Sequence, residues 1–172
     1  MSENRNINDS LRHMPTEEIR EKLQSEAFPF AACMQHWKGD YNIGMLVRNA
    51  NAFGAEKVFY FGKKKWDRRH SVGTHHYTDL IHIGFEEFQE LLEEYTIVGF
   101  DNVVGSVPLE TFEWPEGKIL MVFGEEQEGM TEDVQAACDH LVAITQYGSV
   151  RSLNAGTASA IAMYDYHLKR LR

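Results

Sequence analysis

The stretch that decides the fold is KILMVFGEEQEGM, residues 118–130, in which an unbroken apolar run leads into an acidic loop between two glycines. A continuous apolar run of this length is typical of a strand that is buried on both faces of a sheet. Gly124 and Gly129 permit tight turns where that strand ends. Because a strand buried on both sides needs helices on both sides, the stretch predicts an α/β domain.

Similar apolar runs recur along the chain, and segments with helical spacing separate them. Strands are predicted at 30–34, 57–61, 80–83, 96–100, 118–123 and 140–146, and helices at 15–28, 43–54, 86–95, 131–140 and 152–171. This alternation predicts a mainly parallel sheet with helices on both faces. Because no internal repeat or linker occurs, we predict an N-terminal tail and helix over residues 1–28 and one domain over 29–172.

The composition fits one globular domain with an acidic surface. The 172 residues are 43% hydrophobic and 25% charged, which excludes a wholly disordered or fibrous chain. The net charge of −9, taken alone, argues against a nucleic-acid binder, because such domains are usually basic. The charges are unevenly distributed, however: acid gathers at 86–94 and 125–133, and base at 63–69 and in the last helix.

The cysteines and the hydropathy pattern predict a cytoplasmic protein. Cys33 and Cys138 form no CxxC pattern, so a disulfide scaffold is excluded. No apolar stretch approaches the roughly 20 residues that would span a bilayer. Residues 1–10 also lack the apolar core of a signal peptide. We therefore expect no membrane partner.

Common nucleotide, hydrolase and metal motifs find no support. Residues 124–131 have the glycine spacing of a P-loop, but Met130 stands where the phosphate-binding Lys is needed, and the carboxylates of the loop would repel phosphates. No GxGxxG follows the first strand, and GxSxG is absent. His70, His75 and His76 lie together without an HExxH or Cys partner, so we expect loop histidines and no metal site.

Three segments carry most of the chemical information. Residues 42–54, NIGMLVRNANAFG, open a helix that bears Arg48, and residues 121–130 form the strand and acidic loop. Residues 144–162, ITQYGSVRSLNAGTASAIA, run from a strand through a Gly/Ser loop into a helix that begins with small residues. Each segment alone also admits an ordinary interpretation: a solvated helix charge, a surface loop, or close helix packing.

In this order and spacing, the three segments closely resemble the SpoU-type (TrmH-like) branch of the SPOUT methyltransferases, over about residues 29–170. The patterns are Asn-x-Gly-x-x-x-Arg, Gly-x-Glu-x-x-Gly and Gly-x-Val-x-Ser-Leu-Asn. The residues that match them are Asn42, Gly44 and Arg48, then Gly124, Glu126 and Gly129, then Gly148, Val150, Ser152, Leu153 and Asn154. Two positions depart: Asn49 follows the motif Arg where Thr is common, and Ile144-Thr145-Gln146 stands where Ile-Pro-Met is common.

The resemblance implies a fold, an activity and a cofactor. The family transfers a methyl group from S-adenosylmethionine to an RNA ribose 2′-hydroxyl, and its members are homodimers with a C-terminal trefoil knot. The implied cofactor site lies in that knot, with backbone holding the adenosine part. The implied cofactor-binding residues are Phe100, Asn102, Gly124, Ile144, Gln146, Ser152 and Leu153.

The resemblance also implies the active centre. Arg48 is the catalytic residue, and the family proposal makes it a general base. Since guanidinium groups seldom lose their proton, a bidentate grip on an RNA phosphate fits Arg chemistry better, and both roles stay open. Asn42 would orient Arg48 or the RNA backbone, Glu126 would fix its loop, and Asn154 with Ser152 would shape the active-site end of the last helix.

The RNA, a tRNA or rRNA by resemblance, is expected at the basic loop. The expected RNA-binding residues are Lys63, Lys64, Lys65, Trp66, Arg68 and Arg69. Phosphates favour such a cluster, and Trp66 could stack on a base. His167, Lys169, Arg170 and Arg172 are expected to add to it. The alternative for such a run of charges is a solvated loop.

Two other functions stay open from the sequence. One is a catalytically inactive RNA-binding module with the same fold, and the other is a methyltransferase with a non-RNA substrate. Intact Arg48, Asn42 and Asn154 favour the enzyme over the first, and the basic loop disfavours the second. Binding of S-adenosylmethionine by the purified protein would discriminate the enzyme from the inactive module.

Overall fold

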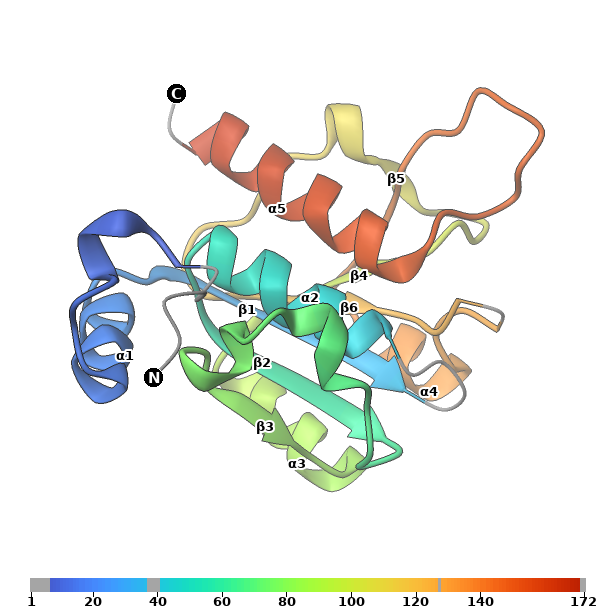
Figure 1. Ribbon diagram of the computed structural model, residues 1–172. Coiled ribbons are helices and arrows are strands. Elements are labelled where there is room, and N and C mark those ends of the chain that lie inside the picture. The colour runs from blue at the N-terminus through green and yellow to red at the C-terminus, as the bar shows by residue number, and fades with distance from the viewer. Residues whose placement is uncertain (1–6, 37–40, 127, 171–172) are drawn as a thin grey trace.

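The strands of the computed structural model, which describes residues 7–36, 41–126 and 128–170, form one sheet (Figure 1). Their bounds are Phe28–His36 (β1), Ala55–Gly62 (β2), Leu80–His82 (β3), Thr96–Phe100 (β4), Val107–Pro108 (β5), Ile119–Phe123 (β6) and His140–Ala143 (β7). The order across the sheet is β3-β2-β1-β6-β4-β7-β5, and every pairing is parallel.

Helices cover both faces of this sheet. They are Thr16–Ser25 (α1), Asn42–Ala52 (α2), Phe85–Glu90 (α3), Glu132–Ala136 (α4) and Ala155–Arg170 (α5). Short 3-10 turns lie at Asp9–Leu11, Arg68–Ser71, Thr74–His76, Leu91–Glu93 and Leu109–Thr111. The predicted α/β class with a mainly parallel, doubly covered sheet is confirmed. No helix in the described parts of the chain is long and apolar enough to cross a membrane.

The centre of the sheet explains the unbroken apolar runs of the sequence. In β1, Phe30, Ala32 and Met34 face the core that α2 and α5 cover, whereas Ala31 and Cys33 face the core that contains residues of α3 and α4. Neighbouring β6 is buried at every position. Because successive side chains of a strand point to opposite faces, a strand covered on both sides must be apolar throughout.

The C-terminal helix α5 is held between α2 and the connection from β4 to β6. Asn49 Nδ2 of α2 donates to the carbonyl of Gly156 at 2.7 Å, and a side chain at Gly156 would come within 2.7 Å of Met45 Cβ. On the other side, the indole of Trp114 donates to Asp165 at 2.9 Å, and Lys169 donates to the carbonyls of the 109–112 turn. The resemblance places the trefoil knot in this part of the chain.

Several element ends differ from the sequence prediction. Helix α4 stops at Ala136, because the Asp139 carboxylate accepts from the backbone N–H of Ile97 and draws the chain into β7. Helix α5 begins at Ala155, where the Asn154 side chain accepts from the N–H of Thr157 as an N-cap. The two-residue strand β5 was not predicted, since Val107–Pro108 shows no apolar run.

The N-terminal segment packs onto the sheet domain through α1. Ile19 is fully buried, although the helix is otherwise mostly exposed. Strand β1 starts at Phe28, so the predicted boundary between residues 28 and 29 lies at the start of a strand. The division of the chain into an N-terminal segment and a sheet domain stays a prediction.

Candidate functional site

A cavity of about 470 Å³ lies beyond the carboxyl ends of β4, β6 and β7. Open parallel sheets commonly bind ligands at this position, and the volume lies within the usual range for small-molecule sites. All seven residues that the sequence assigned to a cofactor line it: Phe100, Asn102, Gly124, Ile144, Gln146, Ser152 and Leu153. The rings of Phe100 and Phe123 stack with centroids 5.0 Å apart at its wall.

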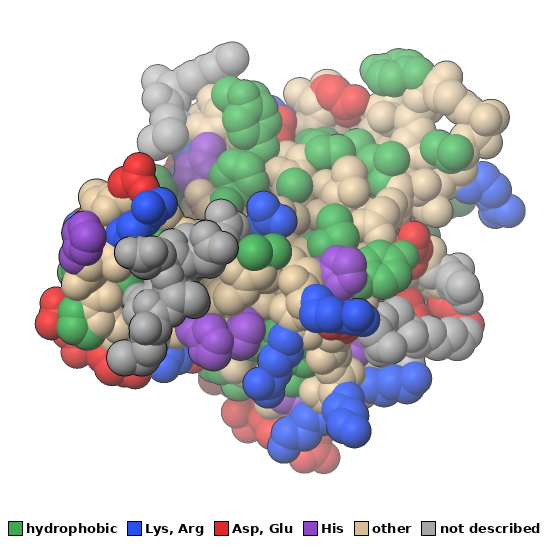
Figure 2. Space-filling view, viewed as in Figure 1, with side chains coloured by type: hydrophobic (Ala, Val, Ile, Leu, Met, Phe, Trp, Pro, Cys, Tyr) green, Lys and Arg blue, Asp and Glu red, His purple; other side chains and the backbone are tan. Residues whose placement is uncertain are grey.

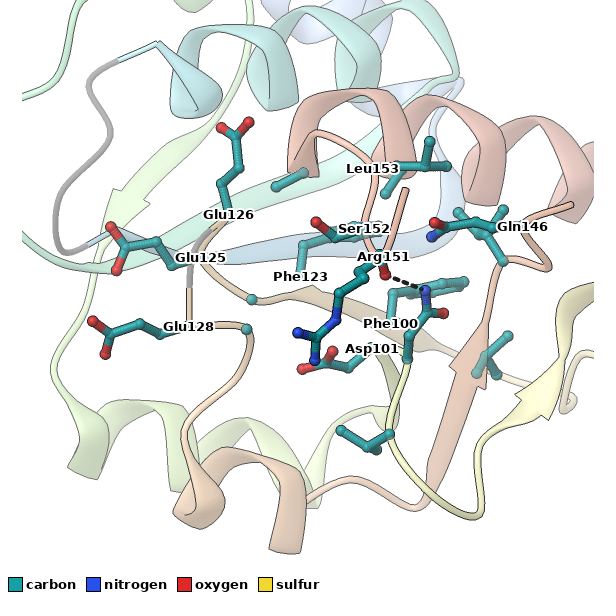
Figure 3. A pocket seen from close by; sticks show the side chains of 18 of the residues that line it. Phe100, Asp101, Phe123, Glu125, Glu126, Glu128, Gln146, Arg151, Ser152 and Leu153 are labelled. Carbon is teal, nitrogen blue, oxygen red and sulfur yellow. Dashed lines mark hydrogen bonds between the residues drawn. The ribbon is translucent and has the colours of Figure 1, made fainter. Parts of the chain in front are cut away.

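The cavity has an acidic side and a less charged side. Figure 3 shows Glu125, Glu126 and Glu128 together on one side, with Gln146 and Leu153 on the other. Asn102 Nδ2 donates to the carbonyl of Arg151 at 3.3 Å, which ties the end of β4 to the loop before α5. The site therefore combines carboxylates suited to a cationic group with an apolar and amide-lined region.

The acidic loop after β6 is anchored from two other strands. Beyond β4, Asp101 Oδ2 accepts from the N–H of Met130 at 2.9 Å. At the end of β1, buried Gln35 accepts from the N–H of Thr131 and donates to its hydroxyl, both at 2.9 Å. Thr131 directly precedes α4, and its hydroxyl accepts from Gln35 and does not cap the helix.

The two loop glycines are required by close approach and backbone conformation. A Cβ at Gly124 would lie 2.3 Å from the backbone of Gly129. Gly129 itself has a φ of +70°, and a Cβ there would lie 2.5 Å from Asp101 Oδ2. These contacts hold the loop in one narrow turn at the cavity.

Asp101 and Gln35 were both missed by the sequence analysis. Each residue directly follows a predicted strand. That position is the only sequence signal that could have indicated either of them. Their partners lie 29 and 96 positions away along the chain. The local pattern therefore does not reveal the contacts.

Two buried oxygen atoms at the cavity lack a partner among the described residues: Gln146 Oε1 and Glu125 Oε1. Leaving such an atom without a hydrogen bond costs about 1–3 kcal/mol, and more for a charged group. Their arrangement fits a ligand that brings hydrogen-bond donors. The side chain at Gln146, one of the positions that depart from the family pattern, is thus chemically suited to a cavity contact.

Three of the four predicted active-centre residues meet at one carboxylate oxygen. Glu126 Oε2 accepts from Asn42 Nδ2 at 3.1 Å and from Asn154 Nδ2 at 3.2 Å. Asn154 Nδ2 also donates to Asn42 Oδ1 at 2.8 Å. We call these three residues the Asn–Glu–Asn network. A fourth residue that the sequence analysis missed, Tyr41, donates from its hydroxyl to the same oxygen at 2.9 Å, and this bond raises the pKa of Tyr41.

Arg48 lies apart from this network. It is exposed on α2, does not line the cavity, and makes no hydrogen bond or ion pair with the other described residues. Helical spacing puts it about two turns after Tyr41 on the same side of the helix. Since no described residue occupies its guanidinium, the exposed group is suited to bind an anion that approaches from outside the protein.

The predicted RNA-binding residues follow the end of β2. Figure 2 shows Lys and Arg side chains gathered over this part of the molecule. Four of their cations are exposed: Lys63, Lys64, Lys65 and Arg68. The guanidinium of Arg69 forms an ion pair with the Asp67 carboxylate, with 2.6 Å between Nη2 and Oδ2. Trp66 is half-buried against the core, with its ring 5.8 Å from that of His75 in an edge-on contact. Among the described residues, the loop thus offers four exposed cations without an ion-pair partner, and a partly covered tryptophan.

The cations expected from the last helix are occupied within the protein. His167 lies 2.8 Å from the carbonyl of Phe53, Lys169 pairs with Asp165 at 3.0 Å, and Arg170 pairs with Glu116 at 2.8 Å. Arg172 lies outside the described residues. These internal contacts hold α5 in place and leave the three described side chains less available to extend the basic loop, which stays a prediction.

The histidines after the basic loop stabilise it. His75 Nδ1 lies 2.7 Å from the hydroxyl of buried Ser71, and its ring lies 4.1 Å from that of His76. Burial, followed by the neighbouring His76 and Arg68 charges, lowers the pKa of His75. Within the described residues, no group of three or more His, Cys, Asp or Glu side chains could hold a metal ion.

Comparison with known proteins gives one matching family model. The model described as the SpoU rRNA methylase family matches residues 29–164, most of the chain and all of the cavity. Those residues include the Asn–Glu–Asn network, Arg48 and the basic loop. The matched range also contains the three segments that the sequence analysis singled out, 42–54, 121–130 and 144–162.

Two curated proteins are similar to most of this chain. The chain is 27% identical over 161 residues to the tRNA (guanosine(18)-2′-O)-methyltransferase of Aquifex aeolicus, covering 89% of this chain and 74% of the relative. It is 29% identical over 140 residues to the mouse tRNA (guanosine(18)-2′-O)-methyltransferase TARBP1, covering 76% of this chain but only 9% of the relative.

The structure of an AdoMet-bound rRNA methyltransferase from Sinorhizobium meliloti superposes with a TM-score of 0.74 at 21% identity, covering 85% of this chain and 59% of that one. At this identity the likeness shows the fold. The chain therefore spans only part of the mouse and S. meliloti proteins that it matches.

Proposed function

Because the chain belongs to the SpoU rRNA methylase family, we propose that it transfers a methyl group from S-adenosylmethionine to a ribose 2′-hydroxyl in tRNA or rRNA. The observation that carries this proposal is the Asn–Glu–Asn network at the rim of a cavity lined by all seven expected cofactor residues. The RNA substrate also fits the cytoplasmic location expected from the sequence.

The cavity residues fit S-adenosylmethionine. The cofactor would supply a methyl group on a cationic sulfonium. The carboxylates of Glu125, Glu126 and Glu128 suit the positive charges of such a molecule, and unpartnered Gln146 Oε1 suits its amino groups. Phe100, Asn102, Gly124, Ile144, Ser152 and Leu153 would complete the binding surface.

The Asn–Glu–Asn network would position the reacting groups. Glu126 accepts from both asparagines. These bonds fix the positions of the start of α2, the acidic loop and the start of α5 relative to one another. Holding a hydroxyl in line with a methyl donor can contribute up to about 7–11 kcal/mol in ideal cases. We assign Asn42, Glu126 and Asn154 to this positioning role.

Arg48 would bind the RNA phosphate next to the target ribose. Its side chain is exposed and has no partner among the described residues. An exposed guanidinium stays protonated, so it suits a bidentate phosphate contact better than removal of the hydroxyl proton. This proposal favours the phosphate contact over the general-base role, and leaves water as the acceptor of the proton.

The RNA backbone would extend from Arg48 onto the basic loop. The 67–71 segment packs against α2, because a side chain at Gly44 would lie 2.9 Å from His70 Cβ and from Ser71 N. Arg68 belongs to that segment, Lys63, Lys64 and Lys65 precede it in the chain, and all four are exposed. Trp66 and Arg69, which were also expected to bind RNA, are less available because they pack on His75 and pair with Asp67.

We further propose that the protein is a homodimer through the outer face of α5. Ile161, Tyr164 and Leu168 are exposed and follow one another at helical spacing, which gives α5 an uncovered apolar stripe. A stripe of this kind is typical of a helix that packs against another surface.

The decisive experiment compares RNA from cells with and without the protein. We expect 2′-O-methylation to disappear from one or a few tRNA or rRNA positions in the deletion strain, and purified protein to restore it with S-adenosylmethionine. Unchanged methylation together with no binding of S-adenosylmethionine would contradict the proposal and favour the inactive RNA-binding module.

A further inference from the structure

An exposed aromatic residue, Tyr41, contacts the Asn–Glu–Asn network. It is the residue directly before α2. The residue is 40% exposed, and its hydroxyl donates to Glu126 Oε2 at 2.9 Å. Glu126 lines the cavity, so the ring lies one hydrogen bond away from a cavity-lining residue. One end of the side chain is thus fixed by the network while the ring remains open to solvent.

A second ring lies beside Tyr41. The His70 imidazole is tilted by 51° against the tyrosine, with ring centroids 5.6 Å apart. His70 reaches this position because Gly44 leaves room for the 67–71 segment on α2. The Tyr41 ring therefore lies between the acidic loop and the segment that carries Arg68.

The surroundings of Tyr41 indicate what it would bind. Arg48 follows on the same side of α2, and Arg68 belongs to the neighbouring turn, so cations suited to phosphates flank an exposed aromatic ring. Aromatic rings in such basic settings stack on nucleobases. The tethered hydroxyl also limits the ring entropy that binding would remove.

We propose that the Tyr41 ring, supported by His70, is a stacking site for a nucleobase of the RNA substrate next to the target ribose. This inference rests on the proposed RNA methyltransferase function and adds a contact to the base. It also replaces Trp66 in the stacking role, because Trp66 is half-buried and its ring packs on His75.

The test separates stacking from the bond to Glu126. Tyr41→Phe keeps the ring and removes the hydroxyl, whereas Tyr41→Ala removes both. The control is Phe85→Ala, which removes a ring of similar exposure, 39% against 40%, on α3. All variants are made in the full chain, and the dissociation constants for bulk tRNA and bulk rRNA are measured by filter binding, with S-adenosylmethionine affinity measured separately.

We expect Tyr41→Ala to weaken RNA binding by about 5- to 150-fold, the equivalent of about 1–3 kcal/mol, while Tyr41→Phe and Phe85→Ala stay within about twofold of wild type. S-adenosylmethionine affinity should change little in Tyr41→Phe. Ultraviolet cross-linking should attach RNA to the peptide that contains residue 41 in the wild-type protein.

Two results would overturn the stacking site. One is wild-type RNA binding by Tyr41→Ala, and the other is an equal loss in Tyr41→Phe, which would assign the effect to the Glu126 bond. Because the readout is RNA binding, it is independent of methyl transfer. A wild-type protein that binds RNA through Tyr41 but methylates none would refute the proposed function and leave the stacking site standing.

Discussion

The side-chain amide of Asn154 donates a 2.8 Å hydrogen bond to Oδ1 of Asn42, a residue 112 positions earlier in the chain. The bond joins the start of α5 to the start of α2, and both amides also donate to Glu126. Two helices and the acidic loop are thereby fixed at one point. Since the three groups act together, their contributions to methyl transfer should not add.

We therefore expect Asn42→Ala and Asn154→Ala each to lower the methyl-transfer rate by about 5- to 150-fold, which corresponds to about 1–3 kcal/mol for an unpaired polar group. The double variant should be little worse than the slower single variant. Single-turnover rates on the methyl-accepting RNA give the comparison, and circular dichroism shows whether each variant is folded. Fully multiplicative losses would contradict a shared network.

Arg48→Ala should fold normally, bind S-adenosylmethionine as the wild type does, and lose methyl transfer. The side chain is exposed and makes no contact with other described residues that the fold requires, so stability should change by less than about 0.5 kcal/mol. Thermal unfolding, cofactor titration and methyl transfer are measured in parallel. Arg20→Ala, an exposed arginine on α1, is the matched control. Near-wild-type turnover by Arg48→Ala would refute its assignment.

Gln35 should control cofactor affinity from outside the cavity. Gln35→Met keeps the length of the side chain but removes both hydrogen bonds to Thr131, so the acidic loop loses one anchor. We expect S-adenosylmethionine to bind about 5- to 30-fold more weakly, from about 1–2 kcal/mol of lost hydrogen bonding. Calorimetric titration checks this.

The conservative variant makes the same test sharper. Thr131→Ser keeps the hydroxyl that Gln35 reaches, so it should bind the cofactor like the wild type. Thr131→Val loses that one bond, so its cofactor affinity should lie between those of the wild type and Gln35→Met. If Gln35→Met melts earlier but binds the cofactor with unchanged affinity, its role is only structural.

The sequence predicted the parts of this molecule that depend on local pattern. Buried strands such as β6 are apolar at every position, and the motif residues of the cavity follow strand ends at fixed spacing. The contacts of Gln35 and Tyr41 could not be predicted, because their partners lie 96 and 85 positions away. The ion pairs of Lys169 and Arg170 could not be predicted for the same reason: a cation in a sequence does not show whether a carboxylate meets it in the fold.

The basic loop should set the salt dependence of RNA binding. Replacing Lys63, Lys64 and Lys65 by Gln removes three exposed cations, and each lost phosphate contact lowers the slope of log affinity against log salt by about 0.7–0.9. Filter binding over a range of salt concentrations measures the slope. A slope equal to that of the wild type would show that RNA binds elsewhere.

Asp67→Asn should have the opposite effect. The hydrogen bond from Arg69 holds the pKa of Asp67 at about 2, so this carboxylate stays ionised and engaged with Arg69 at every pH above that range. Asparagine can still accept from the N–H of Arg69 but releases its guanidinium. We expect tighter RNA binding with a steeper salt slope, and the same gain at pH 6 and pH 8. Weaker binding would mean that the Asp67–Arg69 pair shapes the RNA surface.

The exposed stripe of α5 should hold two copies of the chain together. Ile161 and Tyr164 lie one turn apart on the outer face of the helix, so a carboxylate at either place would be buried in a shared interface. We expect the wild type to sediment at twice its mass of 19.8 kDa, and Ile161→Asp and Tyr164→Asp to sediment as folded monomers. Leu92→Asp places the same charge at an equally exposed leucine away from α5 and should leave the dimer intact. A monomeric wild type at tens of micromolar, or dimers of both α5 variants, would show that this stripe is not the interface.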